Sequence, residues 1–225
     1  MWYSGVSSMK IFGRHFKHLI LVAVLFACPF ISQVKAVLLS PGGVLAATYG
    51  PAPLGGTILA TTSVPFSSGV LQGTLISSVI SSGLNTNVPF TGLTFTYQIV
   101  VSSLSADSAS QISVSSFTSF QTDTSYNNTG IYAGTEVPDY MSRSSGAGNV
   151  VRFTFLTSPI GAGASSALLV IQTDALNWTY TTAGITDGQT VNVNSYAPLA
   201  VPEPASCALI LMGLAVAGLR LRRSK

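Results

Sequence analysis

Histidine, cysteine and lysine are absent from residues 37–200, the long central part of the chain. Without histidine or lysine, this part lacks the usual bases that activate a serine nucleophile, and it cannot form a Schiff base. Metal sites built from histidine and cysteine are excluded for the same reason. Both histidines and both cysteines of the chain lie in the terminal segments: His15, His18, Cys28 and Cys207. We therefore predict no catalytic residue, no metal site and no cofactor in the central part.

Charge is scarce as well, since only 8% of the residues are charged, and most of the basic residues lie near the two ends. Residues 37–200 contain two arginines against six acidic residues, which gives a net charge of −4. Nucleic-acid binding requires clustered lysine and arginine. The central part is therefore mildly acidic, and we expect no nucleic-acid partner.

Residues 1–36 have the features of a secretory signal peptide. An apolar stretch at residues 19–31 follows three basic residues, and Val34 and Ala36 supply the medium and small side chains that precede a cleavage site. We expect cleavage after Ala36. An uncleaved N-terminal membrane anchor is the alternative interpretation. The basic residues are Lys10, Arg14 and Lys17.

The central part, residues 37–197, has the pattern of a β domain. Serine and threonine make up 47 of the 164 residues from 37 to 200. Leu93, Phe95, Tyr97 and Ile99 alternate with polar residues, which is the period of a half-buried strand. Further strands are expected at residues 44–49, 57–62, 70–80, 112–114, 151–155, 167–173, 178–182 and 190–196.

Turn-forming residues separate these segments, among them Asp187-Gly188, and no helical period is present between them. We predict an all-β passenger domain, an antiparallel β-sandwich or jelly roll. Helices are expected only at the two ends, as a signal helix and a single transmembrane helix. A bulge is expected near Ser115-Ser116, a long surface loop at residues 122–148, and a proline-bearing flexible linker at residues 195–204.

The last 28 residues form a separate unit, residues 198–225. A linker ends in Pro202, Glu203 and Pro204, an uncharged apolar run follows at residues 205–219, and a basic tail closes the chain at residues 220–225. The run is short for a membrane span, for which about 20 residues are usual. The positive-inside rule places the tail arginines in the cytoplasm and the passenger outside it. These arginines are Arg220, Arg222 and Arg223.

This order of short motif, apolar run and basic end resembles the PEP-CTERM sorting signal of exopolysaccharide-producing Gram-negative bacteria. The resemblance covers residues 201–225 only. It implies recognition of Pro202, Glu203 and Pro204 by exosortase, a membrane-embedded, transpeptidase-like enzyme, with removal of the tail. The logic is similar to that of a GPI signal, whose anchor-like tail is discarded. A plain single-pass anchor is the alternative.

Three candidates for chemistry in the passenger remain. Glu136 and Asp139 are the closest match to a carboxylate pair for glycoside hydrolysis, although solvated loop residues would look the same. Calcium could use loop carboxylates, but no EF-hand-like motif is present. Exposed aromatic residues could stack on sugar rings, although Trp178 and Tyr180 could equally be core or edge residues of the sandwich. The calcium candidates are Asp123, Asp139 and Asp187, and the aromatic candidates are Tyr126, Tyr132, Tyr140, Trp178 and Tyr180.

Taken together, the sequence predicts a non-enzymatic exported protein. It would pass through an inner-membrane intermediate, with exosortase as its processing partner, to the cell surface or the exopolysaccharide matrix. A carbohydrate-binding or adhesive module is the alternative, with exopolysaccharide as its partner, and a carboxylate-based glycoside hydrolase is a third. Asn127 and Asn177 fit the N-glycosylation pattern, which carries little weight in such a bacterium.

Overall fold

The computed structural model describes residues 38–50, 56–81 and 90–200. These residues form eleven strands and one short 3₁₀ helix, without an α-helix among them. In chain order the elements are β1 (Val44–Ala46), β2 (Ile58–Ser67), β3 (Gln72–Ile80), β4 (Thr94–Val101), β5 (Gln111–Val114), β6 (Thr122–Asn127), η1 (Gly130–Tyr132), β7 (Tyr140–Arg143), β8 (Val151–Thr154), β9 (Leu168–Thr173), β10 (Trp178–Asp187) and β11 (Gln189–Pro198).

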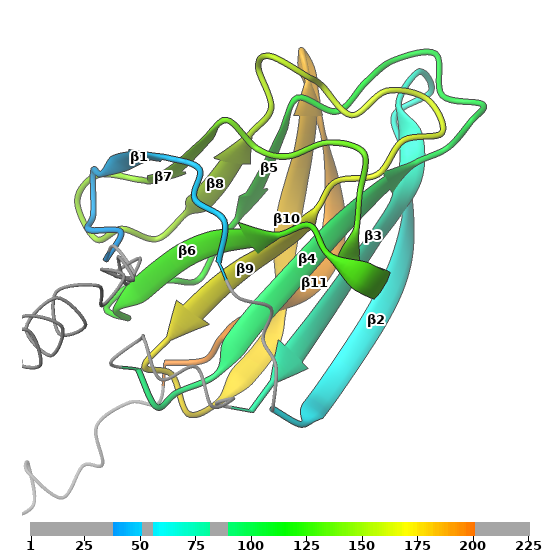
Figure 1. Cartoon of the computed structure of the whole chain (residues 1–225). Helices are drawn as coiled ribbons and strands as arrows, with labels where there is room; N and C mark the ends of the chain where they lie inside the picture. The colour runs from blue at the N-terminus through cyan, green and yellow to red at the C-terminus, as the bar shows by residue number, and fades with distance from the viewer. Residues whose placement is uncertain (1–37, 51–55, 82–89, 201–225) are drawn as a thin grey trace, which may run out of the picture. The chain divides into compact units, whose positions relative to one another are not determined.

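The strands build two antiparallel sheets. The five-stranded sheet has the order β2-β3-β4-β9-β6, and the six-stranded sheet has the order β1-β7-β8-β5-β10-β11. In Figure 1 the first sheet faces the viewer, and β5, β10 and β11 of the second lie behind it. This confirms the predicted all-β antiparallel sandwich. The expected signal helix and transmembrane helix lie outside the described residues, within which no helix is long and apolar enough to cross a bilayer.

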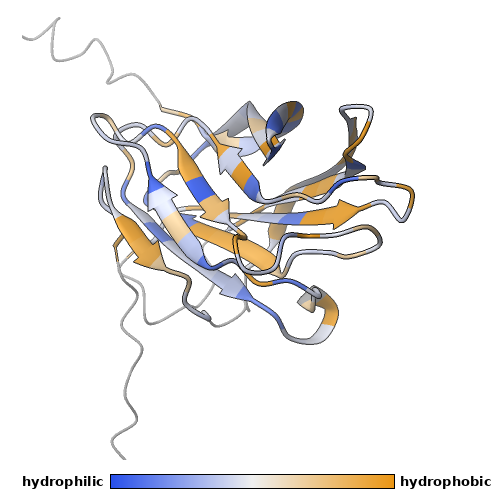
Figure 2. Ribbon diagram, turned by 90° about the horizontal axis from the view of Figure 1, so that it is seen from above, coloured by the Kyte–Doolittle hydropathy of each residue, from blue (hydrophilic) through white to orange (hydrophobic). Residues whose placement is uncertain are grey.

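Alternating side chains from both sheets fill the space between the layers. On β4, Phe95, Tyr97 and Ile99 are fully buried, as their period-2 spacing predicts. Val151 and Phe153 on β8 are buried opposite them in the same core cluster. Figure 2 shows the resulting alternation of apolar and polar residues along the strands. Each of the predicted strands that begin at residues 44, 57, 70, 112, 151, 167, 178 and 190 overlaps a strand of the structure.

The expected long loop at residues 122–148 is wrong in two places, because it contains β6 and β7. The sequence of β6 is polar throughout, yet Thr122, Asp123, Thr124 and Asn127 are buried. Pairing with β9 over its whole length places β6 in the five-stranded sheet. Composition alone cannot indicate such a strand, because its partner is more than forty residues away and no apolar alternation marks it.

Two main-chain details differ from the prediction near strand ends. In place of a bulge at Ser115-Ser116, β5 ends at Val114 and a turn with Ser116 at φ +78° brings Phe117 back into the core. Phe117 then packs edge-on against Phe95, with ring centroids 6.2 Å apart. The predicted linker from residue 195 is also too long, since β11 continues to Pro198 and the Leu199 amide donates to the Asn177 carbonyl at 3.0 Å.

β11 ties the two sheets together through its backbone. The Tyr97 hydroxyl on β4 donates to the Tyr196 carbonyl at 2.6 Å, and the Tyr196 amide donates to the Ser77 hydroxyl on β3 at 3.2 Å. Asp187-Gly188 turns the chain from β10 into β11, with Gly188 at φ +67°, a left-handed conformation that suits glycine. The hairpin is therefore a long, firmly held element of the six-stranded sheet.

The side chain of Arg143, on β7, forms hydrogen bonds that hold Leu39, near the start of the domain, in place. All five of its N–H donors are used: Nε bonds the Gly148 carbonyl, and the two terminal nitrogens bond the remaining acceptors. Its side chain is 5% exposed and has no acidic hydrogen-bond partner among the described residues. The remaining acceptors are the carbonyls of Leu39, Phe117 and Phe120 and the hydroxyl of Thr122, at 2.6–3.3 Å.

Candidate functional site

The predicted processing residues lie outside the described residues, but the domain ends next to them. These residues are Ala36, Pro202, Glu203, Pro204, Arg220, Arg222 and Arg223. At the start, Leu39 is fully buried and its amide donates to the Thr122 carbonyl at 2.9 Å. At the end, the amide of Leu199, the residue after β11, donates to the Asn177 carbonyl. The folded domain therefore occupies nearly the whole interval between the predicted cleavage after Ala36 and the motif.

Glu136 and Asp139 lie together in the connection between η1 and β7, but each is bound to a different segment. The main chain of Glu136 pairs with Ser166, just before β9. The Asp139 carboxylate accepts the amides of Leu156 and Thr157 at 2.6 and 2.9 Å. Hydrogen bonds from the hydroxyl and amide of Thr157, and from the Leu156 amide, hold the pKa of Asp139 below its usual value. A carboxyl group with a lowered pKa is unsuited to donate a proton to a glycosidic oxygen.

The three calcium candidates are not gathered into one site. Asp123 lies on β6, Asp139 binds the turn after β8, and Asp187 ends β10. Within the described ranges, no three acidic, histidine or cysteine residues are close enough to hold a metal ion together. The arrangement offers no carboxylate cage of the kind that calcium prefers.

The structure does bring together one carboxyl pair that the sequence did not reveal. Asp107, in the β4–β5 connection, lies beside Asp187 at the tip of the β10–β11 hairpin. The interaction between the two carboxyl groups lowers the pKa of Asp107 and raises that of Asp187. No signal in the sequence could have identified the pair, because the two residues lie on separate turns far apart along the chain.

Among the pockets lined by described residues, two contain neither a carboxylate nor an imidazole from that part of the chain. The larger, of 630 Å³, lies at the β2–β3 hairpin and includes Phe66 and Gly73. The smaller, of 230 Å³, has Arg143 as its one titratable residue, and all donors of that residue are already used. These pockets therefore lack an acid–base pair that could act on a substrate.

Of the aromatic candidates, Trp178 and Tyr180 are the two that share one strand face. They lie two residues apart on β10, opposite Pro198 and Tyr196 of β11. Tyr180 is 66% exposed and Trp178 is 37% exposed. The rings of Tyr180 and Tyr196 stack with centroids 4.9 Å apart, and their hydroxyl oxygens are 3.2 Å apart. The role of Tyr196 could not be predicted from the sequence, because its position beside Tyr180 depends on the register of the β10–β11 hairpin.

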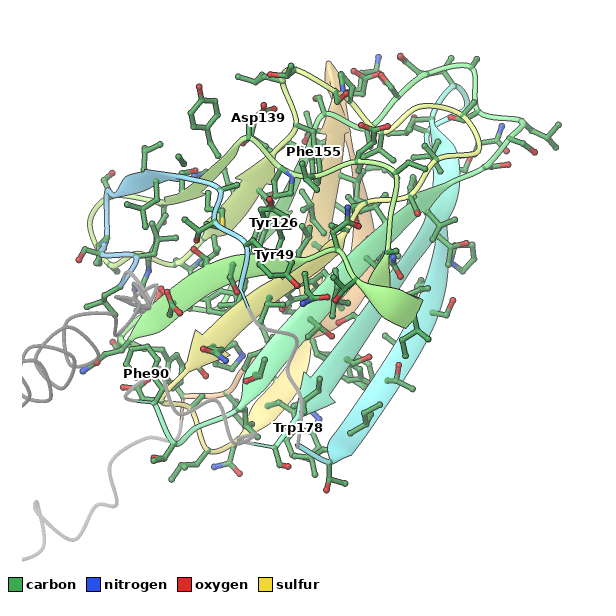
Figure 3. The ribbon with its side chains drawn as sticks, in the orientation of Figure 1. Tyr49, Phe90, Tyr126, Asp139, Phe155 and Trp178 are labelled. Carbon is green, nitrogen blue, oxygen red and sulfur yellow. The ribbon has the colours of Figure 1, made fainter. Side chains whose placement is uncertain are left out.

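The other aromatic candidates lie elsewhere. Tyr126 on β6 packs edge-on against Tyr49, with centroids 6.0 Å apart. Tyr140 begins β7 and is 45% exposed, while the side chain of Tyr132 is outside what the structure describes. Figure 3 shows Asp139, the neighbour of Tyr140, at the opposite end of the domain from Trp178.

The two potential glycosylation sites differ in access. Asn127 is 1% exposed, and its side-chain amide donates to the Gly50 carbonyl at 3.2 Å. Asn177 is exposed in the turn before β10. Only Asn177 is therefore accessible for modification in the folded domain.

Comparison with known proteins gives one match. The family model of the PEP-CTERM protein-sorting motif matches residues 200–224. This confirms the resemblance of the C-terminal residues to that signal. No curated protein and no solved structure matches the chain.

Proposed function

Because the chain carries a PEP-CTERM protein-sorting motif, the mark of an exported bacterial protein sorted through exosortase, we propose that its β-sandwich is a non-enzymatic passenger. The passenger is delivered to the cell surface or the exopolysaccharide matrix of a Gram-negative bacterium. The observation that carries this proposal is the position of the motif, whose match at residue 200 begins directly after the last strand ends at Pro198.

The composition and structure of the passenger support a non-catalytic role. Residues 37–200 lack histidine, lysine and cysteine. Of the two carboxylates considered for hydrolysis, Asp139 is held by the amides of Leu156 and Thr157. The pockets at the β2–β3 hairpin and beside Arg143 contain no carboxylate from the described residues. An enzyme would need an acid, base or nucleophile beside a substrate pocket.

Processing is proposed to occur in the inner membrane. The apolar run at residues 205–219 would hold the exported intermediate there, with Arg220, Arg222 and Arg223 in the cytoplasm. Exosortase then recognises Pro202, Glu203 and Pro204 and removes the tail. The prolines favour an extended backbone around Glu203, which suits presentation to a protease-like enzyme.

Intact-mass measurement of surface-exposed protein tests this function. The chain is expressed in a bacterium that contains exosortase, and in the same strain with exosortase deleted. We expect mature protein to begin at Val37 and to lack residue 220 onward. The Glu203→Gln variant should keep its tail, while the control Glu136→Gln should be processed normally. A full-length tail on all surface-exposed wild-type protein would show that the motif is not a processing signal here.

A carbohydrate-binding or adhesive module is the second candidate function. The observation that favours it is the exposed pair Trp178 and Tyr180 on one face of β10. Binding of the full chain to matrix polysaccharide, measured by co-sedimentation, would distinguish it from a passive structural role. This assay is independent of tail processing.

A further inference from the structure

We propose that the face of the β10–β11 hairpin that carries Trp178 and Tyr180 is a binding platform for a neutral polysaccharide. The sugar rings stack on these two side chains, and Tyr196 holds Tyr180 in position. This inference rests on the second function proposed above, carbohydrate binding, and names its site and its class of ligand.

The spacing of the two aromatic residues creates a row along the strand. Residues two apart on a strand point to the same face and are separated by about 7 Å. Thr179 and Thr181 point to the opposite face, where the Thr181 hydroxyl is 2.9 Å from the Ser115 hydroxyl. Trp178 and Tyr180 are thus presented side by side on one surface, as an extended ligand parallel to β10 would require.

Their exposure indicates a role outside the core. Tyr180 is 66% exposed and Trp178 is 37% exposed, although the domain buries other large aromatic residues completely, among them Phe95 and Phe153. Tryptophan and tyrosine offer large, stiff contact surfaces at a small cost in side-chain entropy, and they dominate many binding sites. Neither residue is needed to fill the space between the two sheets.

Tyr196 makes the platform rigid before a ligand arrives. It is 5% exposed, and its backbone is bonded to Ser77 and Tyr97 of the other sheet. Its ring stacks on that of Tyr180, with their planes 30° apart, and the two hydroxyls form a hydrogen bond. An exposed side chain that is already ordered loses less entropy on binding.

The rest of the face is polar and uncharged. Thr182 and Asn194 are paired next to Tyr180, and Asn192 follows on β11; all three are exposed. From Trp178 to Pro198 the one charged residue is Asp187, at the far tip of the hairpin. Amides and hydroxyls beside aromatic rings suit a ligand whose rim is hydroxylated and whose ring faces carry C–H groups.

These features favour a neutral polysaccharide over other ligands. A nucleic acid or an acidic lipid surface would require lysine and arginine, which the hairpin lacks. A hydrophobic protein partner would need a broader apolar patch than two aromatic residues beside threonine and asparagine.

Fluorescence titration of the full chain tests the proposal. The chain has two tryptophans, so a Trp2→Phe background leaves Trp178 as the single tryptophan reporter. The purified chain, in mild detergent, is titrated with laminarin, dextran and soluble cellulose oligomers as neutral probes and with alginate as an acidic one. We expect at least one neutral probe to change the emission of Trp178 and alginate to bind more weakly.

Variants then locate the site, with binding measured by affinity electrophoresis. Trp178→Ala and Tyr180→Ala should each weaken binding tenfold or more, and Tyr196→Phe by a few-fold. Trp178→Phe, which keeps an aromatic ring, should retain most of the binding and guards against loss through misfolding. Tyr140→Ala, a comparably exposed tyrosine at the other end of the domain, should have no effect.

Two results would overturn the proposal, and they differ in what they leave standing. If a neutral probe binds and the Trp178 and Tyr180 variants bind equally well, the site is wrong and carbohydrate binding remains. If the chain binds none of the neutral probes, carbohydrate binding fails together with this site. Neither result affects the tail-processing function, which the mass measurement tests separately.

Discussion

Replacing Asp123 with asparagine should stabilise the protein at neutral pH and remove part of its pH dependence. Asp123 lies on β6 beside Gln172, and only 5% of its surface is exposed. Its Oδ1 atom accepts no hydrogen bond within the described part of the chain. Loss of solvent raises the pKa of this carboxyl from 3.8 to about 6, against a smaller opposing effect from the Thr124 amide. The charged form is therefore disfavoured in the folded state.

The size and sign of the effect follow from that pKa. A shift of about two units corresponds to about 3 kcal/mol, at roughly 1.4 kcal/mol for each unit. Because the folded state holds the proton more tightly than the unfolded state, the stabilising contribution is fully present below pH 3.8. It is lost as the pH rises through about 6. At pH 7 the folded chain therefore bears a cost of about 3 kcal/mol at Asp123.

Urea unfolding of the full chain between pH 3.5 and pH 7.5, followed by circular dichroism, measures this contribution. The Asp123→Asn variant should exceed the wild type by about 2–3 kcal/mol in free energy of unfolding at pH 7, and should match it near pH 3.5. The control Asp139→Asn should behave oppositely, losing stability at neutral pH, because its carboxylate is stabilised by Thr157 and Leu156. A constant difference between Asp123→Asn and the wild type across this range would refute the reasoning.

Two further predictions concern buried hydrogen bonds. Arg143→Lys should lower the free energy of unfolding by about 2–4 kcal/mol, since lysine cannot replace a planar group that bonds five acceptors. The control Arg152→Lys, at a half-buried residue on β8, should change the free energy of unfolding by less than about 0.5 kcal/mol. Equal effects of the two substitutions in urea unfolding would contradict the role of Arg143. Tyr97→Phe should cost about 1–3 kcal/mol, because it leaves the buried Tyr196 carbonyl without the hydroxyl that bonds it at 2.6 Å. Thermal unfolding at neutral pH checks this, and an unchanged midpoint would mean that Tyr97 does not hold β11.

The strands that could be predicted are those whose sequence carries an alternation or a run of apolar residues. On β8 every second residue is apolar and buried, because one face meets the core and the other is half-exposed. On β4 Phe95, Tyr97 and Ile99 face the core, while Thr94 and Thr96 on the other face are buried as well. β6 could not be predicted, because its Asp123 and Asn127 are buried through sheet pairing and through contacts made by distant residues. A turn at Ser116 and a bulge give the same sequence pattern, since both place a phenylalanine out of phase with the strand before it.

The same limit applies to the candidate site. The i, i+2 spacing of Trp178 and Tyr180 can be seen in the sequence, and it correctly places both on one strand. Their exposure and the support from Tyr196 depend on the register of β11, which pairs Tyr180 with Tyr196. The Asp107–Asp187 pair likewise results from the meeting of two distant turns. Contacts between residues far apart in the sequence are set by topology and register, and local patterns do not encode them.

The end of β11 changes what the processing enzyme encounters. A flexible linker beginning at residue 195 would separate the motif from the domain, but β11 pairs with β10 as far as Pro198. From Pro198 to Pro202 there are four residues, which span at most about 14 Å even when fully extended. If exosortase recognises Pro202, Glu203 and Pro204, as proposed above, it does so within that distance of Pro198, the last residue of β11. The short connection therefore limits how far the motif can lie from the folded domain when the enzyme binds it.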